Sequence, residues 1–168
     1  APSAGDLGAG SGAIALAMAT EVLPAQIFAV EKSDEAMPFT AANFETYAHT
    51  GAKLIQGDLV DAFSDLDGNV SVVASNPPYI PLEMIPRDEE VRLHDPDLAL
   101  YGGEDGMSVI HLVSATAKRL LVPGGALIIE HADSQSEQVC QLLLADGWRD
   151  VRAHQDLTGR DRAVTAKK

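Results

Sequence analysis

The chain has 168 residues, of which 46% are hydrophobic and 22% charged, and its formal net charge is -13. This composition is typical of an ordinary globular protein, and we expect residues 1–168 to form a single domain. The negative charge disfavours binding to nucleic acid, because phosphates are attracted only where a basic patch overrides the total charge.

Strand-like and helix-like segments alternate along the chain. Short apolar runs predict strands, in chain order, at Gln26–Val30, Lys53–Gln56, Val70–Ser75 and Ala126–Glu130. Between and after them, helical spacing and capping residues predict helices at Gly12–Val22, from Ser33 to about His49, from about Gly106 to Leu121, and from a capping box at Ser134–Glu137 to about Ala145. The first segment, Ala1–Gly5, lacks the β-branched residues of a central strand, and we expect the chain to have been cut close to it.

This alternation predicts an α/β fold with a mainly parallel sheet and helices on both faces. Two short segments near the end, Val151–His154 and Arg162–Thr165, predict an antiparallel hairpin that closes the sheet. Ligands of parallel sheets bind beyond the carboxyl ends of the strands. Polar residues follow the expected strands at those ends, namely Asp6, Glu31, Asp58, Asn76 and Glu130.

The first of these ends leads into a glycine-rich stretch, D-L-G-A-G-S-G, at residues 6–12. Glycines at 8, 10 and 12 allow a tight turn and a close approach of the backbone to a ligand. The dinucleotide fingerprint G-x-G-x-x-G does not fit, because the third glycine comes one residue early, and the lysine of a phosphate-binding P-loop is absent. The stretch alone fits a structural turn as well as a ligand site.

Two acidic strand ends favour the ligand site. Glu31 follows the second strand, where a carboxylate can accept both hydroxyls of a ribose. Asp58 follows the third strand and could accept the amine of an adenine, although either residue alone could also be a helix cap or a solvated turn. A nucleoside pocket without phosphate, with Asp6 adding negative charge, suits a cationic ligand such as S-adenosyl-L-methionine.

The motif N-P-P-Y at the end of the fourth strand suggests an acceptor site. The side-chain oxygen of Asn76 and the carbonyl of Pro77 can accept the two hydrogens of a planar NH₂ group. Pro77 and Pro78 lack N–H donors, so few donors compete for these oxygens. The ring of Tyr79 can cover a flat substrate group. The alternative is a proline-rich turn with a capping asparagine.

Seven motifs together resemble a known family: D-L-G-A-G-S-G-A-I-A-L, A-V-E-K-S, G-D-L, N-P-P-Y-I-P, Y-G-G-E-D-G, L-V-P-G-G-A-L-I-I-E and D-L-T-G-R-D-R. From Asp6 to about Thr165, the chain resembles the catalytic domain of peptide chain release factor glutamine methyltransferases of the HemK/PrmC type. N-P-P-Y is shared with adenine-N6 methyltransferases, whereas Y-G-G-E-D-G and D-L-T-G-R-D-R are more specific to the glutamine branch.

The resemblance implies a class I, Rossmann-like methyltransferase fold that binds S-adenosyl-L-methionine. The cofactor would contact Asp6, Gly8, Ala9, Gly10, Ser11, Gly12, Glu31, Asp58, Leu59 and Asn76. The acceptor would bind at Asn76, Pro77, Pro78 and Tyr79, of which Asn76, Pro77 and Tyr79 would be catalytic. The acceptor implied is the glutamine of the Gly-Gly-Gln motif of class 1 release factors, methylated in line on its side-chain nitrogen.

Two departures from the family pattern stand out. The family carries a helical domain before this one, and we expect it to be absent from this chain. The fifth strand is followed by Glu130-His131-Ala132, where the family usually has Glu-Ile-Gly, and we expect His131 to be solvated.

The remaining features predict a monomer in the cytoplasm with no metal and no membrane contact. The single cysteine, Cys140, excludes an internal disulfide, and the longest apolar run, Ala13–Ala19, is too short to span a bilayer. The five histidines lack metal-binding spacing. Two rival functions remain open: an adenine-N6 methyltransferase acting on nucleic acid, and a nucleoside-binding module without turnover.

Overall fold

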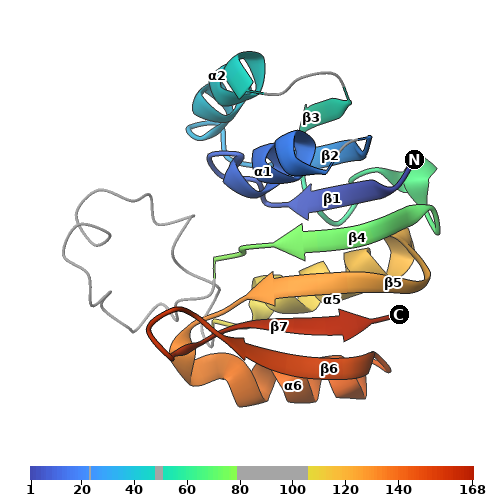
Figure 1. Cartoon of the computed structure of the whole chain (residues 1–168), viewed down its shortest axis with the longest axis vertical. Helices are drawn as coiled ribbons and strands as arrows, with labels where there is room; N and C mark the ends of the chain where they lie inside the picture. The colour runs from blue at the N-terminus through green and yellow to red at the C-terminus, as the bar shows by residue number, and fades with distance from the viewer. Residues whose placement is uncertain (23, 48–50, 79–105) are drawn as a thin grey trace.

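A seven-stranded sheet forms the centre of the molecule (Figure 1). The computed structural model describes residues 1–22, 24–47, 51–78 and 106–168. The strands are β1 (Ser3–Leu7), β2 (Gln26–Glu31), β3 (Ala52–Gln56), β4 (Val70–Ser75), β5 (Leu121–Glu130), β6 (Arg149–Gln155) and β7 (Asp161–Lys167).

The strand order is β3-β2-β1-β4-β5-β7-β6. Strands β1 to β5 pair in parallel, and β7 runs antiparallel to both β5 and β6. The predicted parallel sheet and its closing hairpin are therefore confirmed. The carboxyl ends of β1 to β5 lie along one edge of the sheet, which we call the carboxyl edge, and both chain termini lie at the opposite edge in Figure 1.

Helices cover both faces of the sheet. They are α1 (Ala13–Glu21), α2 (Met37–Tyr47), α5 (Ser108–Leu120) and α6 (Ser136–Ala145), with short 3-10 turns at Ser64–Leu66 and Asp133–Gln135. One face packs against α1 and α2 through a small core built largely of alanines, with Leu16, Ile27 and Phe44. Among the described residues, no helix has the length and apolar character needed to cross a membrane.

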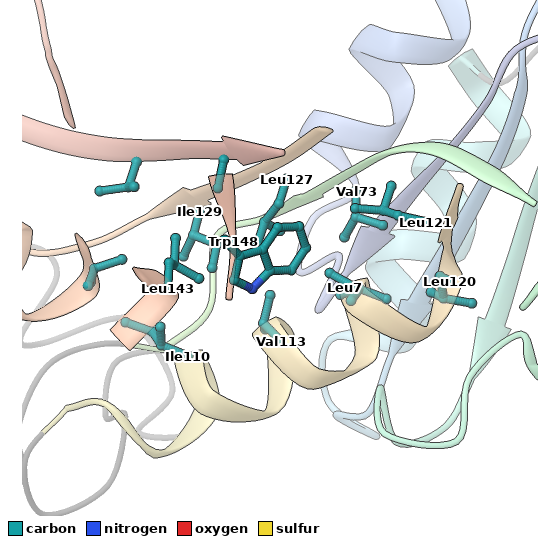
Figure 2. Packing of buried hydrophobic residues seen from close by; sticks show 14 of the residues in the cluster. Leu7, Val73, Ile110, Val113, Leu120, Leu121, Leu127, Ile129, Leu143 and Trp148 are labelled. Atoms are coloured by element: carbon teal, nitrogen blue, oxygen red, sulfur yellow. The ribbon is translucent and has the colours of Figure 1, made fainter. Parts of the chain in front are cut away.

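The larger core lies on the other face, beneath α5 and α6. Trp148 is buried there among leucine, isoleucine and valine side chains from β5, α5 and α6 (Figure 2). Its indole N–H donates to the hydroxyl of Ser114 at 3.0 Å, and Ser114 in turn donates to Asp146 at 2.6 Å. The polar atom of the largest core side chain is therefore satisfied without water.

Strand β1 forms although its residues are poor strand formers. It pairs with β2 over five residues and with β4 over three, so its backbone is bonded on both sides. Ala4 faces the α1 side and Leu7 faces the larger core, so the small side chains let α1 lie close to the sheet. Tertiary pairing overrides the weak intrinsic propensity here.

Strand β5 begins at Leu121, five residues before the expected start at Ala126. Gly124 and Gly125 lie in an irregularity within the strand, between the pairs Val70–Leu121 and Val72–Ala126. Gly124 has a φ of 79°, and a Cβ on Gly125 would lie 3.0 Å from the carbonyl oxygen of Val122. A side chain at Gly125 would crowd this close backbone approach, and the positive φ of Gly124 favours glycine there.

The observed starts of two helices, those expected at Ser33 and at Ser134–Glu137, differ from the prediction. Ser33 caps a turn, since its hydroxyl accepts the N–H of Ala36 at 3.1 Å, and α2 follows only at Met37. The prediction of a capping box at Ser134–Glu137 is wrong. A 3-10 turn precedes α6, and the side chain of Gln135 accepts the N–H of Ala132 at 3.0 Å.

Candidate functional site

The glycine loop between β1 and α1 lies at the carboxyl edge, beside the end of β2. The N–H groups of Gly8 and Ala9 both donate to the carbonyl of Val30, at 3.0 and 2.9 Å. Gly8 and Gly10 have φ values of 81° and 55°, and a Cβ added to either would meet no heavy atom within 4 Å. The loop therefore exposes backbone to open space, where a ligand can approach it.

Helix α2 holds this loop from outside. The hydroxyl of Thr40 donates to the carbonyl of Gly10, and the amide of Asn43 donates to the carbonyl of Ser11 at 2.9 Å. The sequence analysis missed both residues. Their spacing of three places them on one helix face, which is the signal that could have indicated a shared partner.

Glu31 connects the loop to the end of β2. It is 8% exposed, and its two carboxylate oxygens accept the N–H groups of Gly10 and Ser33, each at 2.7 Å. A carboxylate has about four acceptor positions. Glu31 thus clamps the loop and keeps capacity for further donors, such as two hydroxyl groups of a ligand.

Asp6 is the most deeply buried carboxyl group of the site, at 1% exposed. One oxygen accepts the N–H of Ala15 at 3.0 Å, and the other has no hydrogen-bond partner among the described residues. Burial raises the pKa of Asp6 to about 7, the Ala15 bond lowers it, and the charge of Glu31 raises it further. A buried acceptor without a donor is costly, so a donor or cation from a ligand would stabilise it.

Asp58 lies two residues beyond the end of β3, next to the end of β2. Its oxygens pair with Lys32 at 2.8 Å and accept the N–H of Val60 at 3.0 Å, and both contacts lower its pKa. Lys32 had not been predicted to take part. The neighbouring Leu59 is half-buried and packs against the larger core.

The end of β4 is fixed beside β1. The buried hydroxyl of Ser75 donates to the carbonyl of Leu7 at 2.5 Å. After it, Asn76 is exposed, Pro77 is buried and Pro78 is half-buried. The register of β1 and β4 therefore places the Asn76 amide, open to solvent, at the same edge as Asp6. Tyr79 lies outside the described residues.

His131 is fully buried, so the expectation that it is solvated is wrong. The chain beyond β5 stays paired with β7 through a bond from the His131 N–H to the carbonyl of Arg162, at 2.9 Å. Ring atom Nδ1 lies 2.7 Å from the carbonyl oxygen of Ala132, while Nε2 has no partner in the part of the chain that the structure describes. Since the carbonyl can only accept, Nδ1 carries the hydrogen. Across the described parts of the chain, no three His, Cys, Asp or Glu side chains are grouped to hold a metal ion.

Comparison with known proteins identifies the relatives of this chain. Residues 2–84 match the family model described as "Methyltransferase small domain". The chain is 49% identical over 165 residues to the release factor glutamine methyltransferase of Streptomyces coelicolor, covering 97% of this chain and 58% of that protein. It is 41% identical to the 4-amino-L-phenylalanine/4-methylamino-L-phenylalanine methyltransferase of Streptomyces pristinaespiralis, covering 99% and 56%. The chain thus spans less than two thirds of these relatives.

The fold is that of known methyltransferases. A methyltransferase structure from Pyrococcus furiosus superposes with a TM-score of 0.72 at 20% identity, covering 98% of this chain and 74% of that one. The fold class predicted from the sequence and the resemblance carried by the motifs are both confirmed.

The geometry of the glycine loop predicts the effect of Gly12→Ala. Gly12 has a φ of 85°, and an added Cβ would lie 2.9 Å from the ring of Phe44. Gly68 is a matched control, since its φ is 71° and its Cβ position is open. In urea unfolding, Gly68→Ala should lose about 1–2 kcal/mol through backbone strain alone. Gly12→Ala should lose more, and equal losses would show that the Phe44 contact is unimportant.

The raised pKa of Asp6 predicts a pH-dependent contribution to stability. The folded protein keeps a proton on Asp6 up to about pH 7, whereas the unfolded chain loses it near pH 3.8, the ordinary pKa of an aspartate. The contribution of Asp6 to stability therefore falls as pH rises between these values, by at most about 1.4 kcal/mol per pH unit. The difference in unfolding free energy between Asp6→Asn and wild type should shift in favour of the variant across this window. A pH-independent difference would contradict the shifted pKa.

Proposed function

We propose, from its homology to release factor glutamine methyltransferases, that this chain transfers a methyl group to the glutamine of the Gly-Gly-Gln motif of class 1 peptide release factors. The acceptor atom is the side-chain amide nitrogen. The observation that carries the proposal is the placement of Asp6, Glu31 and Asn76 at one edge of the sheet, beside a glycine loop open to a ligand.

The residues present fit S-adenosyl-L-methionine. When bound, this cofactor supplies an electrophilic methyl group. The oxygen of Asp6 that lacks a partner among the described residues suits the ammonium group of its amino acid end, and the open backbone at Gly8 and Gly10 leaves room for that end. Glu31 accepts its ribose hydroxyls with the capacity that remains after the two backbone bonds, and Asp58 with Leu59 binds its adenine.

The end of β4 orients the acceptor amide. The oxygen of the Asn76 side chain and the carbonyl of Pro77 accept the two hydrogens of the glutamine NH₂ group, and Tyr79 covers the amide plane. An amide nitrogen is a weak nucleophile because its lone pair is delocalised, so orientation matters. Holding reactants in the right geometry can lower a barrier by roughly 7–11 kcal/mol in favourable cases. The bond from Ser75 to Leu7 keeps this end of β4 rigid.

Charge favours a protein acceptor over DNA. An adenine-N6 methyltransferase must attract phosphates and extract a base from its stack, which costs a few kcal/mol. With 25 acidic against 12 basic residues, this chain offers little support for either step.

A second candidate acceptor is an aromatic amine. The relative from Streptomyces pristinaespiralis is named for 4-amino-L-phenylalanine, whose NH₂ group is also attached to a flat system. The same two oxygens could accept its hydrogens, so the acceptor must be decided by experiment.

The deciding experiment supplies methyl-labelled S-adenosyl-L-methionine to the full-length protein with four acceptors in separate reactions: release factor, its Gln→Ala variant in the Gly-Gly-Gln motif, DNA and 4-amino-L-phenylalanine. We expect label in the wild-type release factor only. Label in DNA or in the amino acid, with none in release factor, would overturn the proposal in favour of that acceptor.

Removal of the Glu31 carboxylate should weaken cofactor binding. We expect Glu31→Ala to lose about 1.5–3 kcal/mol of binding free energy, the range for hydrogen bonds to a charged group. Glu45→Ala, which removes an exposed carboxylate from α2, is the control and should bind as wild type does. Calorimetry on folded protein measures both, and unchanged affinity in Glu31→Ala would exclude the ribose role.

Asn76→Ala should remove turnover without unfolding the protein. Because Asn76 is exposed, its loss should change stability little, whereas misplacement of the acceptor can cost roughly 10²-fold in rate. Asn69→Ala, at an exposed asparagine just before β4, is the control. Near wild-type turnover in Asn76→Ala would contradict the orienting role.

A further inference from the structure

Helix α2 holds two consecutive carbonyl groups of the glycine loop. The hydroxyl of Thr40 donates to the carbonyl of Gly10, and the side chain of Asn43 donates to the carbonyl of Ser11 at 2.9 Å. Thr40 is fully buried, so water does not compete for its bond. Both carbonyls therefore point toward α2 rather than toward the open side of the loop.

The hydroxyl of Thr40 has one hydrogen and two carbonyl oxygens within reach. The carbonyl of Ala36 lies 2.9 Å away, but it already accepts the backbone N–H of Thr40 at 3.0 Å. The carbonyl of Gly10 has no other donor among the described residues. Because an acceptor left without a donor inside a protein is costly, the hydrogen is needed at Gly10.

The direction of the Gly10 carbonyl fixes that of the next N–H. The peptide group is planar and trans, so the N–H of Ser11 points opposite to the carbonyl of Gly10 and away from α2. Among residues 8–12, the other four N–H groups are bonded within the protein. The N–H of Ser11 has no partner among the described residues, and Ser11 is exposed. The loop therefore offers this donor to a ligand on its open side.

Glycine at position 10 makes this orientation depend on Thr40. Gly10 has a φ of 55° and no side chain to restrict it, so the peptide between Gly10 and Ser11 can rotate at little steric cost. A rotated peptide presents its carbonyl to the open side and turns the N–H of Ser11 toward α2. A carboxylate is repelled by the carbonyl and bound by the N–H. The bond from Thr40 selects the orientation that binds a carboxylate.

We propose that Thr40 is a positioning residue for the amino acid end of the cofactor. By holding the carbonyl of Gly10, it keeps the N–H of Ser11 directed at the ligand, where this N–H donates to the cofactor carboxylate. The oxygen of Asp6 that lacks a partner among the described residues receives the ammonium group of the same end. The inference rests on the proposed function, since it takes S-adenosyl-L-methionine as the ligand.

The test compares ligands with and without the amino acid end. S-adenosyl-L-homocysteine carries this end, whereas 5′-methylthioadenosine keeps the nucleoside and the sulfur but lacks it. Calorimetry on the full-length protein measures the Kd of both ligands for wild type, Thr40→Val, Thr40→Ser and Thr46→Val. Thr40→Val removes the hydroxyl, and Thr40→Ser keeps it. Thr46→Val is the matched control, because the Thr46 hydroxyl donates only to the Ala42 carbonyl, at 2.9 Å within α2.

We expect Thr40→Val to raise the Kd for S-adenosyl-L-homocysteine about ten-fold, as for the loss of one hydrogen bond to a charged group. Its Kd for 5′-methylthioadenosine should stay that of wild type. Thr40→Ser and Thr46→Val should match wild type with both ligands. An unchanged Kd for S-adenosyl-L-homocysteine in Thr40→Val would overturn the positioning role. An equal rise for both ligands would also overturn it, because that result indicates a general loosening of the site.

A measurement on wild type keeps the proposal testable if Thr40→Val does not fold. An analogue of S-adenosyl-L-homocysteine in which hydrogen replaces the carboxylate should bind about ten-fold more weakly than the parent compound. Equal affinity of the two would show that the loop does not bind the carboxylate and would overturn the proposal.

The positioning role and the proposed function fail separately. If the ligands bind as expected but labelled S-adenosyl-L-methionine transfers no methyl group to release factor, the positioning role stands and the acceptor assignment fails. If wild type methylates release factor and Thr40→Val binds S-adenosyl-L-homocysteine as wild type does, the positioning role fails and the proposed function stands.

Discussion

The hydrogen bonds of the Glu31 carboxylate connect the elements on which the site depends. One oxygen fixes the glycine loop through Gly10, and the other fixes the chain that leads to α2 through Ser33. Helix α2 then returns to the loop through Thr40 and Asn43. The loop, the end of β2 and α2 thus form one connected unit. The shape of the ligand site follows from a carboxylate that sequence reasoning had assigned to the ligand alone.

This arrangement costs stability that a ligand can restore. Asp6 and Glu31 are both nearly inaccessible to solvent, and the charge of Glu31 disfavours the charged form of Asp6. Within the described part of the chain, Asp6 keeps an oxygen without a donor, a condition that folded proteins tolerate mainly where function requires it. A cationic ligand supplies the missing donor and charge together. The proposed cofactor, S-adenosyl-L-methionine, combines a cation with a nucleoside and so fits this arrangement.

The sequence predicted the features that local pattern controls. Strand β4 was predicted with its observed bounds, because a short apolar run ends at Asn76 and two prolines. Acidic strand ends at Glu31 and Asp58 were found because parallel strands bring their carboxyl ends to one edge. Features that depend on distant partners were not predicted. Strand β1 forms through pairing on both sides, and His131 is buried next to β7, where its N–H bonds to the carbonyl of Arg162. The hydrogen bond from Thr40 to Gly10 joins residues 30 apart, and the helical spacing of Thr40 and Asn43 does not by itself identify the glycine loop as their partner.

The central claim is that Asp6 contacts the cationic part of the cofactor. It is tested most directly by measuring the number of protons released when the cofactor binds. Burial raises the pKa of Asp6 to about 7, so a fraction of the molecules carries its proton near neutral pH, and a cation placed beside it expels that proton. Calorimetric titration of S-adenosyl-L-methionine in two buffers of different ionisation enthalpy gives the number released. The account predicts proton release by wild type near neutral pH and none by Asp6→Asn. Binding by wild type without proton release would contradict it.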